Sequence, residues 1–172
     1  AALSHQASLQ ITDRHSVGDA IQNLRAAHNI YLHNTFSHLG GDDPVPTNFR
    51  EPLPPFVTGL YLKLTSLEGT TRWSFEQLRS SEASRFVKLI NLFWILLGLL
   101  ATWLLAHRLL ESHLAAMVVT GIVFWFTFHT TPLVDTLYTE LPAAVLLLWT
   151  SYAFLVAIQK NSLPLFLLAG LL

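Results

Sequence analysis

The chain has 172 residues, of which 52% are hydrophobic and 12% are charged, and its net charge at neutral pH is −1. Soluble domains usually carry about 25% charged residues, so this composition argues against an ordinary soluble protein, and the near-zero net charge argues against a nucleic-acid partner. The chain has no cysteine, which excludes disulfides, zinc–thiolate sites and a catalytic thiol.

The charged residues are distributed unevenly. Residues 1–85 hold 15 of the 21. Those in residues 86–172 are Lys88, Arg108, Glu111, Asp135, Glu140 and Lys160. We therefore expect a polar region, 1–85, joined to a membrane region, 86–172. Because the chain begins without Met and ends inside an apolar run, we also expect it to be a fragment of a longer protein.

The polar region contains signals for several short elements. Residues 19–33 carry apolar side chains at helical spacing, which predicts an amphipathic helix. Glycine, aspartate and proline in 40–46 predict a loop. The segment 52–64 is apolar but only about a dozen residues long, so we expect a helix on the membrane surface rather than a span. A short helix is expected to begin at Ser74.

Long apolar runs dominate the second region, at about 86–106, 112–130, 140–159 and 163–172. A membrane-spanning helix needs about 20 mostly apolar residues. Short polar connectors separate the runs, a pattern typical of helical membrane bundles. The predicted fold class is therefore all-α: a polytopic transmembrane helical bundle with amphipathic helices in a long first external loop.

Two predicted spans separate residues 1–85 from the connector 130–140. An even number of crossings would place both segments on one side of the membrane, whereas a span at 52–64 would reverse this parity. The acids that would share one face are Asp13, Asp19, Asp42 and Asp43, with Asp135 and Glu140. The basic residues of the connectors and those before the first span favour opposite orientations.

Asp19 and Glu140 are the leading candidates for catalytic acids, and Asp13 is the alternative to Asp19. Asp19 stands where a helix is expected to begin, so it also suits an N-cap. Glu140 opens an apolar helix, where an acid complements the helix dipole. The residues alone leave both interpretations open.

Arg50 is the leading candidate for a phosphate-binding residue. Its planar guanidinium suits a phosphate, although it could equally pair with Glu51. Asp42 and Asp43 follow two glycines, as in an ordinary turn. The sequence therefore predicts no particular metal ligands.

Two groups of motifs occur in a recognisable order. The run D-A-I-Q-N-L-R-A-A-H-N-I-Y-L-H-N-T-F-S precedes T-N-F-R-E-P-L-P-P-F-V-T-G-L-Y. Further on, L-L-A-H-R-L-L-E-S-H closes an apolar run, and T-P-L-V-D-T-L-Y-T-E-L-P-A-A leads into the next. This order resembles the GT-C superfamily of membrane glycosyltransferases, and is most similar to bacterial relatives of the protein O-mannosyltransferase and aminoarabinose transferase group.

The resemblance implies transfer of a sugar, with inversion, from a polyprenyl-phosphate donor to an acceptor hydroxyl of a protein, lipid or glycan. Asp19 would match the acid of the first loop, Glu140 the acid of the second loop, and Arg50 the basic residue beside the lipid phosphate. Residues 1–85 and 130–140 would lie on the external, periplasmic side of a cell (inner) membrane. The lipid-linked sugar is the implied co-substrate, no cofactor is assigned, and a divalent-cation requirement stays open.

The sequence departs from the family pattern at two positions. Asn23 stands where the family often has an aromatic residue, and Asn34 stands where it has glycine. These departures leave the choice between Asp13 and Asp19 open.

A second class of function fits the same composition: a non-enzymatic membrane protein such as a transporter, flippase or assembly scaffold. Transporters usually place their binding sites near the middle of the membrane, at broken helices. In this chain the acids lie at the ends of the apolar runs. That placement favours chemistry at the membrane surface.

Overall fold

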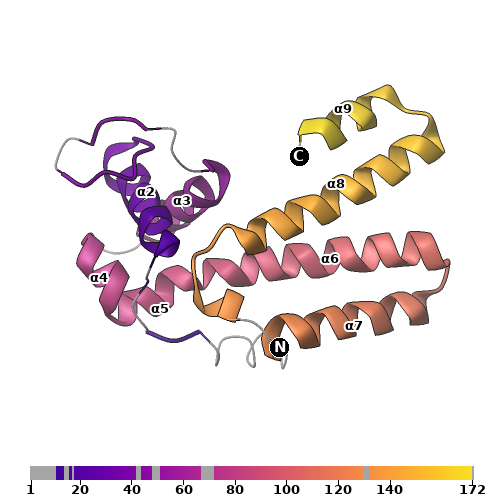
Figure 1. The fold of residues 1–172 in the computed structure, drawn as a ribbon, viewed down its shortest axis with the longest axis horizontal. Helices are drawn as coiled ribbons and strands as arrows, with labels where there is room; N and C mark the ends of the chain where they lie inside the picture. The colour runs from indigo at the N-terminus through magenta and orange to yellow at the C-terminus, as the bar shows by residue number, and fades with distance from the viewer. Residues whose placement is uncertain are drawn as a thin grey trace. The chain divides into compact units, whose positions relative to one another are not determined.

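The computed structural model describes residues 11–13, 16, 18–41, 44–47, 51–66, 72–129 and 132–171. Every regular element in these ranges is helical, as the sequence predicts. In chain order (Figure 1) they are α2 (Asp19–His33), α3 (Leu53–Ser66), α4 (Phe75–Ser80), α5 (Glu82–Lys88), α6 (Ile90–Leu110), α7 (His113–His129), the 3-10 helix η1 (Pro132–Asp135), α8 (Glu140–Lys160) and α9 (Leu163–Leu171).

The chain divides into two compact units. Unit 1 comprises Ala1–Leu92 and Pro132–Thr139, and unit 2 comprises Phe93–Thr131 and Glu140–Leu172. The chain thus leaves unit 1 within α6 and returns to it in the connector after α7. The predicted polar region therefore corresponds to unit 1 only in part, because this unit also takes in a segment from far along the chain.

Helices α2 and α3 lie side by side in unit 1 (Figure 1). Gly59 permits their close approach, because a Cβ at this position would lie 2.8 Å from both the Ala27 carbonyl oxygen and Ile30 Cγ2. α2 has the predicted bounds, and it ends where Asn34 adopts the left-handed conformation with φ 55°. α3 forms over the predicted 52–64 segment and has 14 residues.

The core of unit 1 joins α2 and α3 to the helices that follow. Ser74 caps α4 through a reciprocal capping box with Gln77, which confirms the predicted start of a helix there. The buried apolar side chains of this core are Ala20, Leu24, Tyr31, Leu62, Leu78, Ala83, Val87, Ile90 and Leu137. The connector after α7 therefore contributes to the same core as the N-terminal helices.

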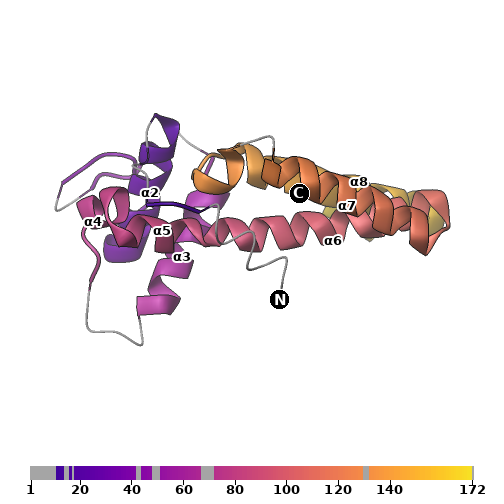
Figure 2. The ribbon, with the colours of Figure 1, turned by 90° about the horizontal axis from the view of Figure 1, so that it is seen from below.

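In unit 2, α6 lies between α7 and α8 (Figure 1), and the three helices overlap as one layer in the turned view (Figure 2). The Trp149 indole of α8 donates a hydrogen bond to the Leu97 carbonyl of α6 at 3.2 Å. α9 folds back on α8, where the rings of Phe154 and Phe166 meet edge to face at 5.6 Å. These contacts place the predicted apolar runs in neighbouring helices.

Two helices in the described ranges are long and apolar enough to cross a membrane. They are Glu82–Leu110, in which α5 continues into α6, and Glu140–Lys160. The apolar helix in the predicted 112–130 run is shorter, because α7 has 17 residues. Length and composition thus identify two candidate spans where the sequence predicts three and the start of a fourth.

Candidate functional site

Among the described residues, Lys88 in the last turn of α5 is the largest fully buried side chain, with 1% of its surface exposed. Its ammonium nitrogen lies 3.1 Å from Oδ1 of Asp135, whose side chain is 16% exposed. The same nitrogen donates a hydrogen bond to the Thr12 carbonyl at 3.1 Å. A buried charge is strongly unfavourable unless it is paired, so these two partners explain how Lys88 is accommodated.

The Asp135 carboxylate also binds Thr12 directly. Oδ1 accepts the Thr12 backbone N–H at 2.7 Å, and Oδ2 accepts the Thr12 hydroxyl at 2.6 Å. Lys88 and Asp135 together therefore hold the Thr12 carbonyl, amide and hydroxyl groups. Charge-assisted hydrogen bonds of this kind are stronger than neutral ones, so Thr12 is held by residues distant in the sequence.

Two buried asparagines hold the connector that carries Asp135. The Asn91 amide donates to the carbonyls of Val134 at 2.9 Å and Thr136 at 2.7 Å. The Asn23 amide donates to the Leu137 carbonyl at 2.8 Å. The connector backbone is thus anchored on both sides of Asp135, independently of the ion pair.

Thr12 and its two neighbours line a pocket of about 640 Å³. The lining residues are Ile11, Thr12, Asp13, Glu82 and Arg85. We call it the Asp13 pocket. Its volume is within the range of small-molecule sites. It combines carboxylates, which can accept a proton from a hydroxyl, with a guanidinium, which can pair with a phosphate. The lining is therefore suited to acid–base chemistry beside an anionic group.

The predicted acids occupy different positions. Asp13 and Asp19 are both exposed, but Asp13 lines the Asp13 pocket, whereas Asp19 lies in the first turn of α2. The N-cap interpretation of Asp19 is wrong, because Gly18 occupies the N-cap position with φ 56°. Asp19 is instead the first helical residue, where its charge complements the helix dipole. Glu140 is the exposed first residue of α8 and belongs to unit 2.

Arg50, Asp42 and Asp43 lie outside the described residues. Within the part of the chain that the structure describes, no group of three or more His, Asp or Glu side chains could hold a metal ion. The sequence analysis leaves a divalent-cation requirement open, and it stays open.

Sequence reasoning did not identify the pairing of Lys88 with Asp135. The sequence places Lys88 at the start of an apolar run and Asp135 in the connector 130–140, without linking the two. The available signal was that each is an isolated charge beside apolar segments, where an unpaired charge is unfavourable. That signal indicates a partner but does not say which one.

The chain was compared with protein-family models, with curated proteins and with solved structures, and none of them matches it.

Proposed function

We propose that the chain is part of an integral membrane glycosyltransferase, which moves a sugar from a polyprenyl-phosphate donor to an acceptor hydroxyl. The observation that best supports this is the Asp13 pocket, which Asp13 and Arg85 both line. Lys88 and Asp135 hold Thr12, the residue before Asp13. The apolar helices Glu82–Leu110 and Glu140–Lys160 would hold the site at a bilayer surface.

The proposed membrane arrangement is a multi-pass bundle in which α6, α7 and α8 cross the bilayer. It is supported by the path of the chain, which leaves unit 1 in α6 and returns to it after α7. Such a return requires an even number of crossings. A span needs about 17 to 25 residues. The 14 residues of α3 fall below this range and the 17 residues of α7 reach its lower end, which favours the parity on which the proposal depends.

In the proposed reaction, Asp13 acts as general base. It accepts the proton of the acceptor hydroxyl while that oxygen forms a bond to the anomeric carbon of the sugar. The bond from this carbon to the phosphate oxygen breaks, and polyprenyl phosphate departs with the electron pair, inverting the anomeric centre. Arg85 would stabilise the negative charge on the departing phosphate.

The resemblance assigns further roles that stay proposals. Arg50 would be a second cation at the phosphate, and Glu140 would be the acid of the second loop. Asp13 is preferred to Asp19 as the base because it lines the pocket that also contains Arg85. Asp19 lies at the exposed start of α2 and therefore provides a matched control.

The test is sugar transfer by the complete protein, assayed with a panel of labelled polyprenyl-phosphate sugars. Loss of a general base typically lowers the rate by about 100-fold to 10,000-fold, so Asp13→Asn is expected to lose transfer by at least about 100-fold. Asp19→Asn is expected to retain most of it. The reverse pattern would assign the base to Asp19. Movement of the intact lipid-linked sugar across the membrane without bond cleavage would instead identify a flippase.

A further inference from the structure

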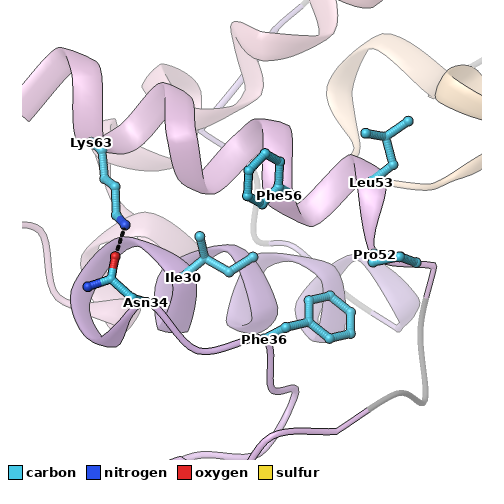
Figure 3. Close-up of a pocket in the computed structure, with 7 residues that line it drawn as sticks. All are labelled: Ile30, Asn34, Phe36, Pro52, Leu53, Phe56 and Lys63. Atoms are coloured by element: carbon cyan, nitrogen blue, oxygen red, sulfur yellow. Dashed lines mark hydrogen bonds between the residues drawn. The ribbon is translucent and has the colours of Figure 1, made fainter.

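A second pocket of unit 1, of about 460 Å³, forms a groove along α2 and α3. Figure 3 shows Lys63 and Asn34 at one end, Ile30, Phe56 and Phe36 along the middle, and Leu53 and Pro52 at the other end. The groove is therefore apolar along most of its length and polar at one end. We call it the α2–α3 groove.

The polar end of the groove is positively charged. The Lys63 ammonium donates a hydrogen bond to the Asn34 side-chain oxygen, which the left-handed C-cap of α2 brings to this end (Figure 3). Lys63 is the single charged residue of α3, and the groove-lining residues within the described ranges include no acid. An anionic group would thus meet a cation here without an opposing carboxylate in the lining.

The outer face of α3 continues the apolar lining into solvent. Leu53, Phe56, Leu60 and Leu64 recur at helical spacing and are 43%, 52%, 44% and 60% exposed. The opposite face of α3 is buried in the interior of unit 1, through Pro55, Thr58, Gly59 and Leu62. An exposed apolar stripe on a helix of 14 residues is typical of helices that lie in a membrane interface.

We propose that the α2–α3 groove binds an anionic phospholipid of the surrounding bilayer, with an acyl chain along Phe56 and Leu53 and the phosphate at Lys63. The charge complementarity selects an anionic over a zwitterionic headgroup, and the continuous apolar stripe selects a lipid over a soluble ligand. The inference rests on the membrane insertion in the proposed function but not on sugar transfer. The groove shares no lining residue with the Asp13 pocket.

The test is lipid binding by the full chain in detergent, with bound lipids counted by native mass spectrometry. Phosphatidylglycerol and phosphatidylcholine are titrated separately. Lys63→Gln is expected to lower the affinity for phosphatidylglycerol about fivefold, since each basic residue near an anionic lipid surface contributes ~1 kcal/mol. Its affinity for phosphatidylcholine should not change. Phe56→Gln is expected to weaken binding of both lipids, because it removes part of the apolar wall.

Two variants serve as matched controls. Arg72→Gln removes an exposed cation and Val45→Gln replaces an exposed apolar side chain, both of them outside the groove. Both are expected to bind lipid as the wild type does. Equal loss in Lys63→Gln and Arg72→Gln would overturn the proposal, because binding would then follow overall charge.

Farnesyl phosphate serves as a competitor that resembles the donor lipid. Its displacement of phosphatidylglycerol at equal concentration would assign the groove to the donor and overturn the proposal. Persistence of the bound phospholipid would support it. Normal lipid selectivity without any sugar transfer would contradict the proposed function alone, whereas normal transfer without lipid selectivity would contradict this inference alone.

Discussion

Replacing Asp135 with asparagine is expected to lower the free energy of unfolding by about 3–5 kcal/mol, the usual effect of removing one partner of a buried ion pair. The substitution removes the carboxylate that pairs with the Lys88 ammonium at 3.1 Å, and this ammonium belongs to a side chain that is only 1% exposed. The Thr12 carbonyl remains as a hydrogen-bond partner of Lys88 but carries no net charge. The amide of the new residue also cannot accept both of the hydrogen bonds that Thr12 donates.

Lys88→Met provides the matched comparison. It leaves the Asp135 carboxylate with both hydrogen bonds from Thr12 and with some access to solvent, since this side chain is 16% exposed. We expect a smaller loss, of about 1–3 kcal/mol, as for a buried polar group that loses a partner. The double variant Lys88→Met/Asp135→Asn should lose less than the sum of the two single losses, because it contains no unpaired buried charge.

The measurement is equilibrium or thermal unfolding of the four proteins in one detergent, at low and high salt. A buried pair is screened little, so the coupling between the two positions should persist at high salt. Additive losses, or a coupling that disappears at high salt, would refute the buried pairing of Lys88 with Asp135. The position of Asp13, next to Thr12, would then no longer be supported by that pairing.

The remaining predictions concern packing and pH. Gly59→Ala is expected to destabilise unit 1 by about 1–3 kcal/mol, because its Cβ would meet the Ala27 carbonyl at 2.8 Å. Gly121→Ala, whose Cβ would have no neighbour within 4 Å, should be neutral or stabilising in the same thermal unfolding assay. The pKa of His28 is lowered below its usual 6.5, mainly because burial disfavours the charged ring, although the hydrogen bond to the Trp73 carbonyl opposes this. The unfolded chain therefore binds a proton that the folded chain does not, and this contribution to stability is present above about pH 6.5 and lost as the pH falls below it. The melting temperature should accordingly fall less between pH 7.5 and 5 in His28→Gln than in the wild type, and equal falls would contradict the assignment.

Local sequence patterns were sufficient to predict several of the helices. The apolar spacing of 19–33 predicts α2 with its observed bounds, and the run 140–159 predicts α8 to within one residue. The start of α4 at Ser74 was also predicted. These elements depend on residues three or four positions apart, which a single sequence displays directly.

The interactions of Lys88 with Thr12 and Asp135, beside the Asp13 pocket, could not be predicted in the same way. Lys88 bonds to Thr12, 76 residues earlier, and to Asp135, 47 residues later. Such distant pairing is decided by the packing of unit 1 and not by local spacing. The choice between Asp13 and Asp19 was undetermined for the same reason, because only the folded chain shows that Asp13 lines a pocket with Arg85.

Single-cysteine labelling in sealed vesicles tests most directly the proposed membrane arrangement, in which two crossings separate Asp19 from Glu140. The chain has no cysteine, so Asp19→Cys, Glu140→Cys and Glu111→Cys each introduce one thiol at an exposed position. A membrane-impermeant maleimide should label positions 19 and 140 from the same side of the bilayer, and position 111 from the other. Labelling of positions 19 and 140 from opposite sides would contradict the proposed two crossings between them.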